Sequence, residues 1–299
     1  MLPFHTLDVF TDRAFTGNPL AVVLEADDLS VGQMQTLARE FNLSETIFVQ
    51  PPRDPAHRAR VRIFFPTAEI PFAGHPTIGC AILLAETDHG PGDFETTLVL
   101  EEEAGLVPVR VRRLAGRTTA EFTAPVLPHA APGSAEPALI ALALDLPPGD
   151  IGFARHRPAI WQGGPRFLYV PVASLSALGR ARPIEPHWSA LMAAAGVDSA
   201  YLYTPGDTED YRARMFSPTA GVPEDPATGS ASAILAAQLM AAGTIRPGET
   251  RLRLRQGVEM GRPSDIGLTV LANAGGLTEV RIAGTALRVS EGRITLPPD

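Results

Sequence analysis

Residues 62–71 read Arg-Ile-Phe-Phe-Pro-Thr-Ala-Glu-Ile-Pro, and residues 214–223 read Arg-Met-Phe-Ser-Pro-Thr-Ala-Gly-Val-Pro. The two segments lie about half a chain length apart in a chain of 299 residues. After a slip of two residues the match resumes, with the segment 74–81 opposite the segment 224–231. Two copies are too few for a solenoid, which needs about three or more short repeats. The sequence therefore predicts a duplicated domain with one equivalent loop in each half.

Each of these loops runs into a segment that is almost free of charge. Cys80–Ala85 follows the first loop and Ser230–Met240 follows the second. A helix that is apolar on every face is buried on all sides, whereas a surface helix is amphipathic. We therefore expect a central buried helix in each half of the chain.

The starts of these two helices are candidate anion sites. We expect Pro76 and Pro226 in the first turns, and Asp225 and Thr77 as caps of unpaired amides. A helix start carries unpaired N–H groups and a partial positive charge. If both starts meet at one cleft, they form a receptor for an anion such as a substrate carboxylate.

The composition suits an enzyme made of two domains. With 45% hydrophobic residues, the chain can bury two cores of ordinary size. The net charge is −8 and the pI is about 5.4, which argues against nucleic acid as a partner. The sequence has no apolar run long enough for a membrane span and no signal-peptide pattern, so we expect no membrane association and a cytoplasmic location.

Several kinds of catalysis are excluded by missing residues. All 25 basic residues are arginine, so lysine-based Schiff-base chemistry is impossible. Cys80 is the only cysteine, which rules out disulfides and paired thiols. The seven histidines show no spacing typical of a metal site, so we expect neither a metal nor another cofactor. Acid–base chemistry by carboxylates, histidine and hydroxyls is what remains.

The order of apolar segments predicts a mixed α and β fold. Period-two alternation indicates strands at 7–10, 20–24, 46–49, 60–65, 98–100, 108–112, 167–172, 200–203, 251–255, 268–271, 279–282 and 286–289. Helices are expected at 30–41, 136–144 and 186–195, besides the two central ones. The Pro- and Ala-rich stretch 125–136 is expected to separate the two domains. We read Glu101–Glu103 as a solvated strand end.

Aligning the two halves singles out Glu45. The segment Leu43–Val49 matches the segment Val197–Tyr203, and Glu45 then lies opposite Ser199. The duplicated scaffold therefore carries a carboxylate on one side only. A carboxylate at a strand end in a partly dry cleft has its pKa raised toward neutrality, as a proton-transfer catalyst requires.

Five separated motifs resemble the phenazine-biosynthesis, PhzF-like isomerase family. They are Asp8–Val22, Asn42–Thr46, Phe72–Gly79, Glu224–Ala231 and Gln256–Ser264. The resemblance covers nearly the whole chain in register. It implies an α+β fold like that of diaminopimelate epimerase, with two pseudo-symmetric domains, each a mixed sheet curled into a barrel around a central buried helix. The implied boundaries are 1–127 plus about 284–299 for the N-terminal domain and 128–283 for the C-terminal domain, with the last strand crossing back to the first domain.

The resemblance also implies roles for individual residues. Glu45 matches the general acid/base, which lies in the cleft between the domains of such proteins. The groups expected to bind the substrate and its carboxylate are the side chains of His75, Asp225 and Ser230 and the amides at Gly74 and Gly229. Related epimerases use two cysteines at the helix starts, where this chain has other residues. We read Cys80 as a core residue.

These residues predict a cofactor-independent isomerase that moves a proton between carbons of a small carboxylate substrate. The family also implies a homodimer. Three alternatives stay open: a hydrolase or lyase acting on a small acid, a two-base epimerase in which Asp225 acts opposite Glu45, and a non-catalytic ligand-binding protein. The sequence does not name the substrate, and it leaves the role of Arg262 open between anion binding and a surface ion pair.

Overall fold

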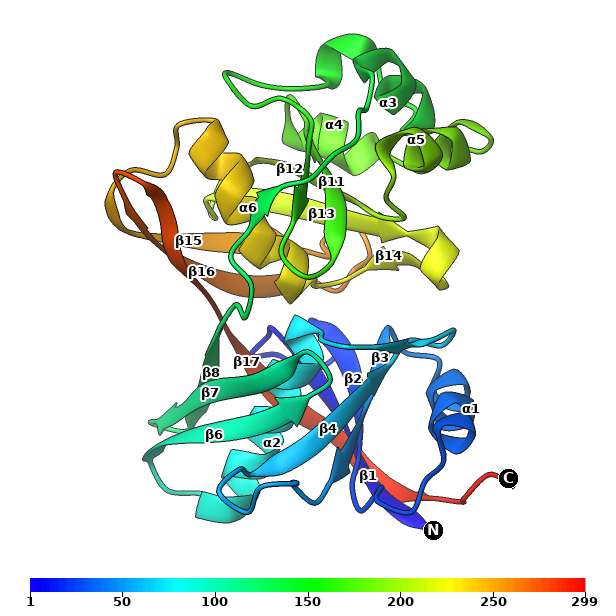
Figure 1. Ribbon diagram of the computed structural model, residues 1–299, viewed down its shortest axis with the longest axis vertical. Coiled ribbons are helices and arrows are strands. Elements are labelled where there is room, and N and C mark those ends of the chain that lie inside the picture. The colour runs from blue at the N-terminus through cyan, green and yellow to red at the C-terminus, as the bar shows by residue number, and fades with distance from the viewer. Residues whose placement is uncertain (299) are drawn as a thin grey trace. The chain divides into compact units, whose positions relative to one another are not determined.

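Eight strands of the first unit close into a barrel (Figure 1). In the computed structural model, which describes residues 1–298 except the side chain of Ala220, contacts divide the chain into two units. The first unit comprises Met1–Pro125 and the segment that begins at Ala283, and the second comprises Val126–Ile282. The barrel strands are β1 (Leu2–Val9), β2 (Asn18–Val23), β3 (Glu45–Gln50), β4 (Ala59–Phe64), β6 (Phe94–Glu102), β7 (Gly105–Leu114), β8 (Arg117–Thr123) and β17 (Gly276–Ile294). β1 pairs with β2 and β17, and β17 also pairs with β8, which completes the ring.

The second unit repeats the strand pairing of the first. Its strands are β9 (His129–Ala130), β10 (Ala159–Gln162), β11 (Arg166–Pro171), β12 (Ala200–Pro205), β13 (Tyr211–Ser217), β14 (Val222–Asp225), β15 (Gly248–Gln256) and β16 (Ser264–Asn273). In the first unit each strand pairs with the next in the order β1, β2, β3, β4, β6, β7. These five pairings are antiparallel, parallel, antiparallel, parallel and antiparallel. The same order holds along β10, β11, β12, β13, β15 and β16. The short strand β5 (Glu69–Ile70) adds to β4 as β14 adds to β13. The predicted duplication is confirmed at the level of topology.

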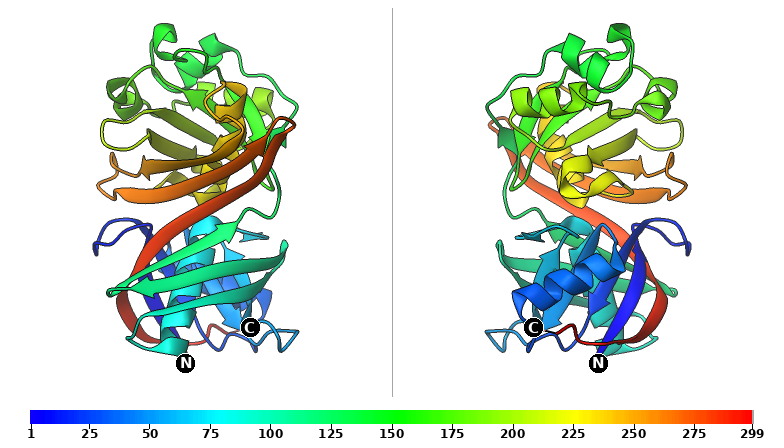
Figure 2. Two further views of the ribbon diagram at one scale, coloured as in Figure 1. Left: turned by 90° about the vertical axis from the view of Figure 1, so that its left-hand side faces the viewer. Right: turned by 90° about the vertical axis from the view of Figure 1, so that its right-hand side faces the viewer.

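A buried helix lies within the curled sheet of each unit (Figure 2). These helices are α2 (Gly74–His89) and α6 (Gly229–Ala241), and nearly all of their first three turns is buried. α2 approaches the barrel wall closely at Gly79, where an added Cβ would lie 2.6 Å from Leu20 and 2.8 Å from Val9. The predicted α+β fold, with a mixed sheet around a central buried helix in each half, is confirmed.

Shorter helices cover the outside of the sheets. In the first unit, α1 (Val31–Phe41) packs Met34 and Leu37 against the aromatic rings of Phe48 and Phe64. In the second unit, α3 (Pro137–Ala143), α4 (Leu175–Arg180) and α5 (His187–Ala195) bury a second cluster around Trp188, and two 3-10 turns, η1 (Pro148–Asp150) and η2 (Pro218–Ala220), connect elements. Because these helices shield one face of each sheet, the strands carry apolar residues on both faces there.

Three local expectations were wrong. Glu101 and Glu102 are buried at the end of β6, and the run of acids is therefore not a solvated strand end. Pro76 is in the first turn of α2, but Pro226 lies before α6, which starts at Gly229. Thr77 does not cap an amide, because its hydroxyl contacts the Ala73 carbonyl and the Glu102 carboxyl.

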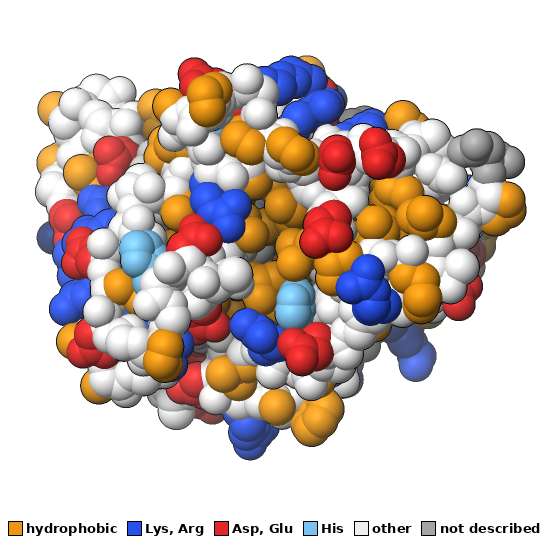
Figure 3. Space-filling view, turned by 90° about the horizontal axis from the view of Figure 1, so that it is seen from below, with side chains coloured by type: hydrophobic (Ala, Val, Ile, Leu, Met, Phe, Trp, Pro, Cys, Tyr) orange, Lys and Arg blue, Asp and Glu red, His pale blue; other side chains and the backbone are white. Residues whose placement is uncertain are grey.

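The surface mixes charges of both signs. One face, seen in Figure 3, has arginine and acidic side chains interspersed with apolar ones, without a continuous positive region. Among the helices of residues 1–298, none combines the length and the apolar character that crossing a membrane requires.

Candidate active site

Glu45, His75 and Asn18 come together in the first unit. Glu45 is the first residue of β3, Asn18 is the first residue of the parallel neighbour β2, and His75 lies in the first turn of α2. Oε2 of Glu45 lies 3.4 Å from Nδ1 of His75, and Nδ2 of Asn18 lies 3.2 Å from the same nitrogen. Glu45 is 6% exposed and His75 is 2% exposed, so the carboxyl and the imidazole are largely withdrawn from water.

The Asn18 contact fixes the tautomer of His75. An amide nitrogen only donates, so Nδ1 of His75 accepts and the ring proton is on Nε2. Burial lowers the pKa of His75 to about 3, and the ring is therefore neutral near pH 7. Within residues 1–298, Nε2 has no hydrogen-bond partner. A buried N–H without a partner is costly, so this group is poised to donate to an acceptor of a ligand.

The starts of both central helices lack side-chain caps. In the described part of the chain, no side chain caps α2 at Ala73 or α6 at Thr228. The outer helices differ, since Ser30 caps α1 and Ser174 caps α4. The first amides of a helix have no partner inside the helix. The amides beginning at Gly74 and Gly229 therefore suit an anionic group.

Asp225 is held at the end of β14 by a network that includes Gln256. The Thr228 hydroxyl donates to Oδ2 of Asp225 at 2.6 Å. Nε2 of Gln256 donates to the Asp225 carbonyl at 2.7 Å and to the Thr228 hydroxyl at 2.9 Å, and its Oε1 accepts from the Thr228 amide at 3.2 Å. Gln256 is fully buried. The loop before α6 is thus built rigidly, with the partly exposed Ser230 in the first turn of the helix.

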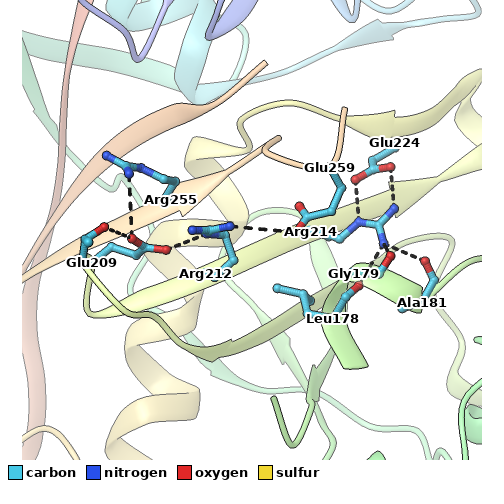
Figure 4. Close-up of polar contacts among 10 residues, drawn as sticks. Leu178, Gly179, Ala181, Glu209, Arg212, Arg214, Glu224, Arg255 and Glu259 are labelled. Carbon is cyan, nitrogen blue, oxygen red and sulfur yellow. Dashed lines mark hydrogen bonds and ion pairs between the residues drawn. The ribbon is translucent and has the colours of Figure 1, made fainter. Parts of the chain in front are cut away.

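Arg214 fixes the residue next to Asp225 (Figure 4). Its guanidinium binds Glu224 through Nε and Nη2, both at 2.8 Å, and its Nη1 donates to the carbonyls of Leu178 and Ala181 at the end of α4. In the first unit, Arg62 binds Glu69 in the same bidentate way. Bidentate pairs orient both partners, so the strand leading to each loop is anchored.

The structure thus gathers the predicted residues in two groups. Glu45, His75 and Gly74 lie together in the first unit, and Asp225, Gly229 and Ser230 lie around the start of α6 in the second. The sequence reading missed Asn18 and Gln256. Both occur inside the recognised motifs, and that was the signal that could have found them: Asn18 starts the buried strand β2, and Gln256 ends β15, where Leu254 is the other buried residue.

Two further residues have clear surroundings. Ser199, the counterpart of Glu45, donates to the neighbouring Asp198 carboxylate and contacts the Ser217 hydroxyl. Cys80 is buried inside α2, and burial raises its pKa to about 12, which makes it a core residue as expected. Among the residues that the structure describes, no three His, Cys, Asp or Glu side chains form a group able to hold a metal ion.

Known proteins resemble this chain over nearly its full length. The PhzC-PhzF family, described as phenazine biosynthesis-like protein, matches residues 7–292. An uncharacterized isomerase from Mesorhizobium japonicum is 44% identical, with 96% of each chain covered. The trans-2,3-dihydro-3-hydroxyanthranilate isomerase of Pseudomonas chlororaphis is 38% identical over 97% of this chain and 98% of its own. A crystal structure of a PhzF-family protein from Bacillus anthracis superposes with a TM-score of 0.86 at 25% identity, covering 99% of both chains. With its family match over residues 7–292 and these named relatives, the chain belongs to the PhzC-PhzF family and is an isomerase.

Proposed function

We propose that this isomerase needs no cofactor and that Glu45 moves a proton between carbon atoms of a small carboxylate-bearing substrate. The observation that carries the proposal is the buried contact between Glu45 and His75 at the start of α2. A carboxyl group shielded from water is a more effective base toward a C–H bond than a solvated one.

Each group would have one task. Glu45 takes a proton from a carbon next to an unsaturated group, the C–H electrons pass into that system, and the protonated carboxyl returns the proton to another carbon. Nε2–H of His75 donates to a polar oxygen of the substrate. The amides at Gly74 and Gly229 bind the carboxylate and stabilise the charge that develops. Asp225 and Ser230 hold the remaining polar groups of the substrate.

The named relative suggests the first compound to test. Trans-2,3-dihydro-3-hydroxyanthranilate carries a carboxylate, an amino group and a hydroxyl on an unsaturated ring, which matches the groups this proposal requires. A substrate of this kind has a C–H bond activated by its neighbours and an anionic handle for the helix starts.

Replacing the carboxylate tests the proposal directly. Glu45→Gln keeps the shape but removes the base, so turnover of trans-2,3-dihydro-3-hydroxyanthranilate should fall about 10²–10⁴-fold with little change in KM. In deuterated water the wild type should place deuterium on a product carbon, and the variant should not. His75→Ala and Asp225→Ala should instead raise KM more than they lower kcat.

Glu40→Gln is the matched control, because Glu40 is an exposed glutamate of the same unit. This variant should behave like the wild type. Undiminished turnover in Glu45→Gln would end the general-base assignment. A product that gains oxygen from labelled water would show hydrolysis instead of isomerisation.

A further inference from the structure

Glu102 lies behind the start of α2 and reaches it through Thr77. Glu102 is the last residue of β6, and its Oε1 lies 2.6 Å from the Thr77 hydroxyl. The same hydroxyl lies 2.7 Å from the carbonyl of Ala73, the residue just before Gly74. All three groups are buried, so water does not compete for these polar atoms, and we interpret both contacts as hydrogen bonds.

Counting hydrogens assigns the proton. The Thr77 hydroxyl has one hydrogen, and the Ala73 carbonyl can only accept. The geometry allows the Thr77 hydroxyl to donate to either oxygen, and both contacts are full two-centre hydrogen bonds only if Thr77 donates to Ala73 and Glu102 donates to Thr77. Glu102 must then be a carboxylic acid with its proton on Oε1. An ionised Glu102 would compete with the Ala73 carbonyl for a single hydrogen.

The second unit has an amide at the strand end where the first unit has the acid. Gln256 is the last residue of β15, the strand that follows the central helix α6 as β6 follows α2. Its Nε2 donates to the Thr228 hydroxyl directly before α6, at 2.9 Å. An amide carries N–H groups at every pH, whereas a carboxyl can donate only while it is protonated. The last residue of the strand that follows the central helix thus contacts a threonine hydroxyl in both units, although the two threonines differ in position relative to their helices.

We propose that Glu102 is a positioning residue that acts as a neutral carboxylic acid, holding the first turn of α2 through Thr77 and Ala73 as Gln256 holds the turn before α6. The turn that it holds carries Gly74 and His75. Their part in substrate binding rests on the proposed function above, but the hydrogen-bond chain itself does not.

The surroundings of Glu102 favour the neutral form. Burial raises the pKa of Glu102 to about 8. Its Oε2 has no hydrogen-bond partner in the part of the chain that the structure describes, so no donor is present to solvate an anion. On α2, Cys80 is the nearby titratable group, with its pKa raised by burial. Arg58, just before β4, and Arg60 on β4 pair with Asp88 and Glu103. Glu101 on β6 accepts from the Asp54 and Arg53 amides and contacts His57, and β7 presents Gly105 opposite Glu102.

The proposal predicts a pH-dependent loosening confined to one helix start. As the pH rises through about 8, Glu102 ionises and loses its donor hydrogen, so the Thr77 hydroxyl cannot serve both oxygens. The start of α6 should not respond, because Gln256 does not titrate.

Hydrogen exchange followed by mass spectrometry tests this without any substrate. In the wild type, protection of the segment 74–79 should fall about tenfold or more between pH 7 and pH 9, after correction for the intrinsic exchange rate, while the segment 229–234 keeps its protection. Glu102→Gln supplies an N–H donor and should keep 74–79 protected at both pH values. Thr77→Val removes the hydroxyl and should lower this protection at both.

The reciprocal variant is the matched control. Gln256→Glu should transfer the pH dependence to 229–234 and leave 74–79 as in the wild type. The proposal is overturned if Glu102→Gln loses protection at pH 7, if wild-type protection of 74–79 does not change up to pH 9, or if the carboxyl ¹³C signal of Glu102 shows an ionised group at pH 7. None of these results depends on the catalytic role of Glu45, so the two proposals fail separately.

Discussion

Two groups face Nδ1 of His75, the Asn18 amide and the Glu45 carboxyl. Nδ1 accepts from Asn18 and the ring is neutral, because burial lowers its pKa to about 3. Asn18→Asp replaces the donor by a carboxylate, which favours a proton on Nδ1 and a charged ring. We expect the pKa of His75 to rise by more than one unit and turnover to fall about 10-fold or more. Imidazole ¹⁵N shifts measured against pH report both the tautomer and the pKa.

Asn273→Asp is the control for the added charge, since Asn273 is exposed in the other unit. It should leave the His75 signals unchanged. If Asn18→Asp also leaves them unchanged, the assigned tautomer is wrong.

Cys80 should be dispensable for chemistry. The thiol is buried in α2, and burial raises its pKa to about 12, so little thiolate exists near pH 7. Cys80→Ala should keep wild-type kcat and KM and lose roughly 1–2 kcal/mol of unfolding free energy. Chemical denaturation and steady-state kinetics measure the two effects. Rapid inactivation of the folded wild type by iodoacetamide would contradict this assignment.

The site could be predicted from sequence only where a residue type was unusual for its position. Glu45 stood out because its counterpart is Ser199, and His75 because its motif, Phe72–Gly79, resembles that of the family. Glu102 was misread, because a run of three acids is typical of a solvated strand end. Its partner Thr77 is 25 residues away, and only the fold brings a buried hydroxyl to it.

At the scale of elements, the contact between α2 and the barrel depends on Gly79. An added Cβ would lie 2.6 Å from Leu20 and 2.8 Å from Val9, closer than carbon atoms approach. Gly79→Ala should lower the unfolding free energy by about 1–3 kcal/mol, because overpacking outweighs the gain in helix propensity. Urea denaturation measures the change.

Gly32→Ala is the matched helical control. Gly32 is exposed in α1, and its added Cβ would meet only the Ser30 hydroxyl at 3.8 Å. This variant should gain up to about 1 kcal/mol. Equal effects of the two substitutions would show that α2 does not pack closely at Gly79.

Many elements followed from periodicity, but β13 was missed although nearly all of its residues are buried. Other missed strands have weak patterns. β8 reads Arg-Thr-Thr-Ala-Glu-Phe-Thr and buries only Thr118, Ala120 and Phe122, so its inward face is too polar and small to stand out. The two strands expected at 279–282 and 286–289 form the single strand β17. The two central helices were predicted correctly, because an uncharged apolar segment of that length is typical of a helix that is buried on all sides.

At the scale of the whole molecule, the buried side chains of His75 and Glu102 make the unfolding free energy depend on pH in opposite directions. His75 has a lowered pKa, so its contribution is present above about pH 6.5 and is lost as the pH falls toward 3. Glu102 has a raised pKa, so its contribution is present below about pH 4.5 and is lost as the pH rises to about 8. Relative to the wild type, Glu102→Gln should become progressively more stable between pH 5 and pH 8. His75→Gln should lose less stability than the wild type between pH 6 and pH 4.

Urea denaturation at each pH gives the unfolding free energy of each variant and of the wild type. The prediction concerns how the difference between them changes with pH, so a pH-independent loss of stability from either substitution does not affect it. Parallel curves for Glu102→Gln and the wild type would show that Glu102 is already ionised at pH 5. The homodimer implied by the family stays a prediction, which light scattering of the same samples tests.

The barrel of the first unit is completed by β17, and β1 pairs with residues as distant as Ile294. A ribosome therefore finishes residues 1–125 long before they can form their native sheet. Until β17 emerges, the nascent unit exposes the open edges of β1 and β8, and the intervening 126–282 are made and can fold in the meantime. In a chain truncated shortly after residue 282, the second unit should therefore fold and the first should remain unfolded, although the segment 1–125 is intact.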